Sequence, residues 1–90
     1  MHTLEQLREA IDKADMKLLE ALAERMRVVE EIGELKRAQN IHSFDPERFK
    51  AILSSRAEIG KALGLSPEYI EKLYGVIHEY ALHIEETRHA

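Results

Sequence analysis

The feature that most constrains the fold is a helical pattern that runs without a break over residues 4 to about 38. The segment Thr3-Leu4-Glu5-Gln6 is typical of a capping box in which Thr3 is the N-cap. Gly33 is a weak helix former late in the run, and one such residue is tolerable. About 34 residues at 1.5 Å each make a rod roughly 50 Å long. A compact chain of this size has a radius of gyration of only about 12 Å, so its other helices cannot cover the rod.

Two shorter helices follow, and each begins at a proline. Asp45-Pro46 predicts an N-cap followed by proline at the first helical position, for a helix that runs to about residue 63 with Gly64 as its C-cap. Ser66-Pro67-Glu68 repeats the start signal for a third helix that ends near residue 87. No stretch alternates as a β-strand does. The sequence therefore predicts an all-α fold in one domain, 1–90, with three helices at about 4–38, 46–63 and 67–87.

The long helix also indicates a partner chain. Its apolar residues form one stripe at helical spacing: Leu4, Leu7, Ile11, Ala14, Leu18, Leu22, Val29 and Ile32. A lone domain of 90 residues buries only a modest core, so oligomerisation would add stability. We expect an intertwined helical homodimer in which the two long helices pack together and the shorter helices wrap around them.

Composition narrows the classes of partner. Hydrophobic residues make up 44% and charged residues 33% of the chain, as in ordinary globular proteins. The net charge of −4 argues against a general affinity for nucleic acid or an anionic membrane. There is no cysteine, so a disulfide framework and a thiolate nucleophile are excluded. With no signal peptide and no apolar run of membrane-spanning length, we expect a cytoplasmic protein.

Cations interrupt the apolar stripe of the first helix. The same spacing places Arg25 and Lys36 close to the centre of the stripe and Arg8 near its edge. Burying an unpaired cation is costly, so each of these residues needs a partner. Two explanations stay open. The cations form ion pairs with carboxylates of another helix, or they line a cavity that binds an anion, where Arg suits a carboxylate through bidentate geometry.

The second helix repeats this pattern with two arginines. Arg56 falls within its apolar face, and we expect the stem to cover apolar surface while the head reaches water or a carboxylate. Arg48 lies one turn after Asp45, which favours a local ion pair. The apolar face itself is expected to be core: Phe49, Ile52, Leu53, Ile59 and Leu63.

The third helix carries an apolar stripe and a more polar face beside it. The stripe predicted to be core comprises Ile70, Leu73, Ile77, Tyr80 and Ile84. The neighbouring face comprises Tyr74, His78, Ala81 and Glu85. Glu85 gains functional interest only if this face meets Arg25 and Lys36. His78 and His83 are five residues apart and do not share a helix face, so no metal site is expected.

Taken together, these segments resemble the all-helical chorismate mutase family. The resemblance covers nearly the whole chain, and the spacing from Arg8 through Arg25 and Lys36 to Arg48 makes it specific. The segments that carry it are Leu7-Arg8-Glu9-Ala10-Ile11-Asp12, Leu18-Leu19 with Ala23-Glu24-Arg25, Ile32-Gly33-Glu34-Leu35-Lys36, Asp45-Pro46-Glu47-Arg48 and Leu73-Tyr74-Gly75-Val76-Ile77-His78-Glu79.

The resemblance implies a dimer with two sites, each binding chorismate, a dicarboxylate with an ether-linked enolpyruvyl group. Arg25 would bind one carboxylate, and Arg8 of the other subunit would bind the second. Lys36 would bridge a carboxylate and the ether oxygen, while Asp45 and Arg48 would contact the region of the ring hydroxyl. Rearrangement to prephenate, a step in phenylalanine and tyrosine biosynthesis, needs no nucleophile, metal or redox cofactor. Catalysis then rests on holding a compact conformer and stabilising charge on the ether oxygen.

Three substrate-site positions depart from the family pattern. Phe49 stands where many members have a Glu that meets the substrate hydroxyl, and Ala81 stands where Ser is common. Glu85 replaces a Gln that donates to the ether oxygen. An ionised carboxylate would repel that oxygen, whereas a protonated one could donate to it. With Arg25, Lys36 and Glu85 as the expected catalytic residues, the sequence predicts an enzyme that favours mildly acidic pH or a site that raises the pKa of Glu85.

Other functions stay open at this point. An isochorismate-pyruvate lyase or an aminodeoxychorismate mutase would share the fold and the carboxylate-binding cations. A non-catalytic helical dimer, such as a regulatory module, would instead use Arg25 and Lys36 in structural ion pairs. A fused or docked partner enzyme of the aromatic pathway would also be compatible with the sequence.

Overall fold

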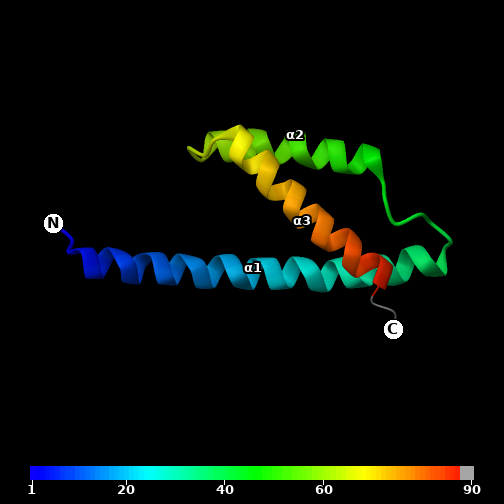
Figure 1. Cartoon of the computed structure of the whole chain (residues 1–90), viewed down its shortest axis with the longest axis horizontal. Coiled ribbons are helices and arrows are strands. Elements are labelled where there is room, and N and C mark those ends of the chain that lie inside the picture. The colour runs from blue at the N-terminus through cyan, green and yellow to red at the C-terminus, as the bar shows by residue number, and fades with distance from the viewer. Residues whose placement is uncertain (88–90) are drawn as a thin grey trace.

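The computed structural model describes residues 1–87, and that part of the chain folds into three α-helices (Figure 1). Helix α1 spans Leu4–Ala38, α2 spans Pro46–Ala62 and α3 spans Pro67–Thr87. The prediction of an all-α fold with one long and two shorter helices is confirmed. In residues 1–87, no helix combines the length and the apolar composition needed to span a lipid bilayer.

The helices begin with side-chain caps on the expected residues. The hydroxyl of Thr3 accepts the backbone N–H of Gln6 at 3.1 Å, and the Gln6 side chain accepts the N–H of Thr3 at 2.9 Å, which completes the capping box. At the start of α2, Oδ1 of Asp45 accepts the N–H of Arg48 at 3.0 Å. The hydroxyl of Ser66 accepts the N–H of Tyr69 at 3.3 Å at the start of α3. These local signals fix where each helix starts.

Two of the helices are followed, just beyond the C-cap, by a residue in the left-handed backbone conformation. After α1, Asn40 has φ 55°, and the N–H of Ile41 donates to the carbonyl of Lys36 at 2.8 Å. After α2, Gly64 has φ 85°, and the N–H of Leu65 donates to the carbonyl of Gly60 at 2.8 Å. Both are Schellman motifs, in which the left-handed residue follows the C-cap. The C-cap of α2 is therefore Leu63, and the expectation that Gly64 occupies the cap is wrong by one position.

Helix α3 crosses diagonally between the other two helices and contacts both of them (Figure 1). Over the described residues, the backbones of α1 and α2 do not approach each other. Val29 of α1 packs against Ala81 and Ile84 of α3 in the main buried cluster, with Met26 beside it. This arrangement leaves α1 and α2 as opposite sides of a space whose floor is α3.

Glycines permit the close approach of α3 at both contacts. A Cβ atom on Gly33 of α1 would lie 3.0 Å from the Cα of Glu85, and one on Gly60 of α2 would lie 2.7 Å from Cγ1 of Ile70. Gly33 is thus more than a tolerated weak helix former. Its missing side chain brings the backbone of Glu85 against α1, one turn before Lys36.

The N-terminal half of α1 projects beyond the other helices (Figure 1). Residues 1–21 are all exposed, and the chain measures 57 × 27 × 15 Å with a radius of gyration of 16.3 Å. Of the apolar stripe expected to be core, Val29 is buried and Leu22 half-buried, while the remaining members are exposed. Most of the stripe is therefore left uncovered within one chain, as the length of the helix indicated, because no element of the described chain reaches it. The homodimer that would cover it stays a prediction.

The cores of α2 and α3 also differ from the expected stripes. Ile59, Leu63 and Tyr80 are exposed. Small residues replace them at the helix contacts, since Ala57 and Ala81 are buried. The diagonal course of α3 explains the difference, because a crossing helix buries a short patch at each contact and not a whole stripe.

Candidate active site

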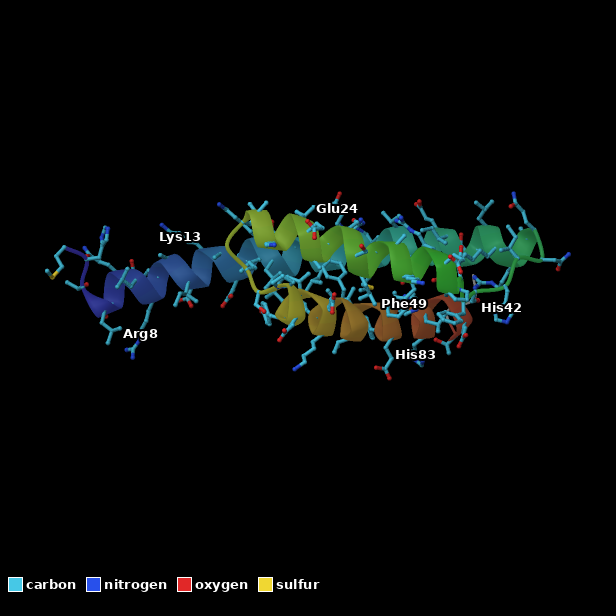
Figure 2. All side chains as sticks on the ribbon, turned by 90° about the horizontal axis from the view of Figure 1, so that it is seen from above. Arg8, Lys13, Glu24, His42, Phe49 and His83 are labelled. Atoms are coloured by element: carbon cyan, nitrogen blue, oxygen red, sulfur yellow. The ribbon has the colours of Figure 1, made fainter. Side chains whose placement is uncertain are left out.

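A cavity of about 430 Å³ lies between α1, α2 and α3 and the loop that joins α1 to α2. Seven of the eight residues predicted to bind substrate line it: Arg25, Lys36, Asp45, Arg48, Phe49, Ala81 and Glu85. The eighth, Arg8, is exposed on the part of α1 that extends beyond α2 and α3 and lies far from Phe49 (Figure 2). The single chain therefore gathers all the predicted residues except the one that the resemblance assigns to the other subunit.

The cavity is electropositive although the chain is acidic. Four cations line it, and they are Arg25, Lys36, Arg48 and Arg56. Two carboxylates, Asp45 and Glu85, oppose them, so positive charge is in excess by two while the whole chain carries −4. The remaining lining includes apolar side chains of α1 and α2 such as Val28, Ile32 and Ile52. Such a site favours a small anion with an apolar body.

Lys36 is held in place by two contacts. Its Nζ lies 2.9 Å from Oε1 of Glu85 and donates to the backbone carbonyl of Ser43 at 2.7 Å. The side chain is largely buried, and it stands in the last turn of α1, where the Schellman motif turns the chain back toward the cavity. An ammonium group fixed by two acceptors retains a third N–H donor for a ligand.

Glu85 is buried to 9% exposure at the point where α3 meets α1. Its backbone carbonyl accepts a hydrogen bond from Nη1 of Arg37 at 2.7 Å, and its Cα faces Gly33. Apart from the ion pair with Lys36, Oε1 has no hydrogen-bond partner among residues 1–87. The face of α3 that carries Glu85 therefore meets Lys36, as its functional interpretation requires. For Lys36 the structure therefore shows the internal ion pair and also a place in the wall of the cavity.

Arg25 has no carboxylate partner among the described residues. Its guanidinium carbon lies 5.9 Å from the centre of the Tyr74 ring, at the outer limit of a cation–π contact. The side chain is half-buried and lines the cavity. For Arg25, the geometry favours the anion-binding explanation over the structural ion pair.

The two arginines of α2 are placed differently from their predicted roles. Oδ1 of Asp45 accepts the backbone N–H of Arg48, and the predicted ion pair between the two side chains is not formed in the described part of the chain. Arg56 lines the cavity as well, and its Nη1 donates to the hydroxyl of Ser55 at 2.8 Å. Arg48 is exposed and lines the cavity, while the half-buried Arg56 pairs with a hydroxyl in place of a carboxylate in the described part of the chain.

His78 is a cavity residue whose face on α3 the sequence indicated, but whose contacts with other elements it did not. Its ring stacks on Phe49, with centroids 4.0 Å apart, and lies tilted against Phe44 at 5.7 Å. Its Nε2 is buried and has no hydrogen-bond partner among the described residues. Burial lowers the pKa of His78 below its usual 6.5, and the charges of Arg25 and Lys36 lower it further, while Glu85 opposes them. The signal that was available is its spacing with Ala81 and Glu85, at i, i+3 and i+7 on one face.

Metal binding finds no support in the described part of the chain. Among residues 1–87, no three His, Asp or Glu side chains gather in a group that could hold a metal ion.

Comparison with known proteins places the chain in a family. The family described as chorismate mutase type II matches residues 7–86. The T-protein of Enterobacter agglomerans is 42% identical over 65 residues, which cover 72% of this chain and 17% of that protein. A bifunctional chorismate mutase/prephenate dehydratase of the same organism is 37% identical over 73 residues, which cover 81% of this chain and 19% of that protein. The isochorismate pyruvate lyase of Pseudomonas aeruginosa is 36% identical over 78 residues, which cover 86% of this chain and 76% of that protein.

The extent of these matches differs between the relatives. The chain spans less than a fifth of the length of the T-protein and about a fifth of the bifunctional protein, whereas it spans most of the lyase. The family match, in contrast, takes in all of α2, nearly all of α1 and α3, and every residue that lines the cavity. The chain belongs to the chorismate mutase type II family.

Proposed function

We propose that this chain is a chorismate mutase that converts chorismate to prephenate in the cavity between its three helices. The observation that carries the proposal is the positive excess in the cavity, with Arg25 lacking any carboxylate partner among residues 1–87. A dianionic substrate would supply the missing negative charge. The lining also includes apolar walls that suit a carbocyclic ring.

In the chemistry that we propose, the protein only positions the substrate and stabilises the negative charge that develops on the ether oxygen. In the rearrangement, the ether C–O bond breaks while a C–C bond forms within the same molecule, so no proton or external nucleophile is required. Arg25 would bind one carboxylate, and Lys36 would bridge a carboxylate and the ether oxygen. Because Glu85 and Ser43 already fix the Lys36 ammonium, little reorganisation is needed as negative charge develops on that oxygen.

A homodimer is part of this proposal because the resemblance assigns the second substrate carboxylate to Arg8 of the other chain. At 1.5 Å per residue, Arg8 lies about 26 Å from Arg25 along the axis of α1, so it cannot reach the cavity of its own chain. The exposed stripe from Leu4 to Leu18 offers a second copy an apolar surface on the same part of α1. Packing of two long helices would place each Arg8 near the cavity of the other chain.

Glu85 should weaken the stabilisation of negative charge on the ether oxygen. If its carboxylate weakens the field of Lys36 at that oxygen, Glu85→Gln should raise kcat near pH 8 by about tenfold, because a neutral amide donates where a carboxylate repels. The measurement is kcat at about pH 8, with Glu86→Gln on the exposed neighbour as the matched control. A Glu85→Gln enzyme that is slower than the wild type would remove this role.

A second candidate is a lyase acting on isochorismate. The observation that favours it is Phe49, which puts an aromatic ring stacked on His78 in the wall where an acid would contact a ring hydroxyl. The isochorismate pyruvate lyase is also the relative whose length the chain matches most fully among those compared above. An aminodeoxychorismate mutase on the same fold is a further variant of this candidate. A docked partner enzyme that consumes prephenate fits the bifunctional relative.

The direct test is turnover by the purified protein. Chorismate is added, the loss of its diene absorbance is followed from about pH 5 to pH 8, and the product is identified as prephenate or not. Isochorismate and aminodeoxychorismate are assayed in parallel. Prephenate formation would support the mutase, and pyruvate release from isochorismate would support the lyase. No reaction with any of the three would favour a non-catalytic helical dimer.

A further inference from the structure

His78 joins three elements of the cavity wall through its ring. It projects from α3, stacks on Phe49 in the first turns of α2 with an interplanar angle of 20°, and meets Phe44 of the preceding loop at 55°. Phe44 lies between Ser43, which accepts from Lys36, and Asp45, which caps α2. The aromatic cluster of Phe44, Phe49 and His78 is therefore the contact that closes the segment 43–49 onto α3.

We propose that His78 is a positioning residue, whose neutral imidazole holds Phe44 and Phe49 against α3 and so keeps the cationic wall of the cavity in place. The residues that depend on this contact are Ser43, which orients Lys36, and Arg48, which is adjacent to Phe49. Neither is touched by His78 in the described contacts. His78 therefore acts on a ligand through the segment that it fixes.

The neutral imidazole is the form of His78 that suits its position in the aromatic cluster. Nε2 is buried and has no hydrogen-bond partner among residues 1–87, and the rings stacked beside it offer no acceptor for a second N–H. The charged groups that face the same cavity are Glu85 on its own helix, Arg25 and Lys36 on α1, and Asp45, Arg48 and Arg56 on α2. Burial lowers the pKa of His78, the cations of α1 add to this effect, and Glu85 opposes it.

Protonation should therefore loosen the cluster. An imidazolium ion would need water or an acceptor at Nε2, and it would gain one only by leaving the stack. Because the lowered pKa favours the neutral form in the folded state, the cluster is intact at pH 6.5 and above, and it is lost only as the pH falls through the lowered pKa of the folded state. Loss of the cluster frees the segment 43–49 without removing Lys36 or Arg25. The apparent affinity for a ligand then falls in proportion to the fraction of chains in which this wall is still in place.

The experiment has an arm that needs no substrate. The ring-proton shifts of Phe44 and Phe49 are followed by NMR from about pH 8 to pH 5 in the wild type and in His78→Phe, which keeps an aromatic ring and cannot titrate. In the wild type, both rings should shift with the titration of His78. In His78→Phe, they should not. Rings that do not shift in the wild type while the His78 imidazole itself titrates would overturn the proposal whether or not the protein is an enzyme, and this arm also serves if a variant fails to fold.

The kinetic arm rests on the proposed function. As the pH falls through the titration of His78, KM for chorismate should rise up to about tenfold in the wild type. His78→Phe should keep a low KM on both sides of this titration, and His78→Ala should have a high KM on both sides. His83→Phe, on the exposed face of α3, should behave as the wild type. A KM in His78→Phe as high as in His78→Ala would show that the imidazole has another role and would refute the stacking function.

Discussion

Replacement of Arg25 by alanine is expected to lower kcat/KM for chorismate by about 10²–10³-fold, because the substrate carboxylate would lose its charged partner in a partly desolvated site. The same replacement should leave the free energy of unfolding within about 0.5 kcal/mol of the wild type. Arg25 forms no ion pair with the described residues, and its contact with Tyr74 is long at 5.9 Å. A group that serves the ligand and not the fold can be removed without cost to stability.

Two measurements check this expectation together. Turnover is measured by the loss of chorismate absorbance, and stability by urea denaturation at a fixed protein concentration. Arg27→Ala is the matched control, since Arg27 is exposed on the same helix and does not line the cavity. If Arg25→Ala instead cost about 3–5 kcal/mol of stability, Arg25 would belong to a buried structural pair and the non-catalytic dimer would be favoured.

Mixing two inactive variants is expected to restore activity if Arg8 comes from the partner chain. Arg8→Ala and Arg25→Ala should each be nearly inactive as homodimers, because every site in them lacks one cation. In a mixed dimer, one site combines the intact Arg25 of one chain with the intact Arg8 of the other, and the second site lacks both. Random exchange makes about half of the dimers mixed, so the mixture should recover about a quarter of the wild-type activity.

The control for this experiment is a pair of variants whose substitutions lie in the same cavity of one chain. Arg25 and Lys36 line the same cavity within one chain. A mixture of Arg25→Ala and Lys36→Ala should therefore recover nothing, because each chain carries a defective cavity of its own. Recovery in this pair, or no recovery with Arg8→Ala under conditions that allow subunit exchange, would contradict the shared site.

The helices could be predicted from the sequence because their signals are local. The Thr3 capping box and the Asp45-Pro46 start involve residues within one turn of each other, and both form as expected. The end of α2 was misplaced by one residue, since Gly64 marks the position after the cap and not the cap. Arg25 and Lys36 were detectable because a cation at an apolar position breaks the helical stripe.

The rest of the cavity depends on how α3 crosses its neighbours, which periodicity does not encode. Ser43 contributes through its backbone carbonyl, and a backbone group has no sequence signature. His78 meets Phe44 and Phe49 only because the loop folds back onto α3. The resemblance supplied Asp45, Phe49 and the other positions by family pattern, and their gathering in one cavity agrees with it.

The close approach at Gly33 has a consequence for how the charge of the cavity can change. The backbone of Glu85 rests against this glycine, and its carboxylate reaches Lys36 one turn further along α1. The separation of the two charged groups is therefore governed by the tightness of a helix crossing. An uncharged methyl group at position 33 would push the helices apart and alter the electrostatic potential at the ligand. In this fold, the size of a residue that carries no charge and lies outside the cavity lining can tune how strongly the site stabilises a negative charge.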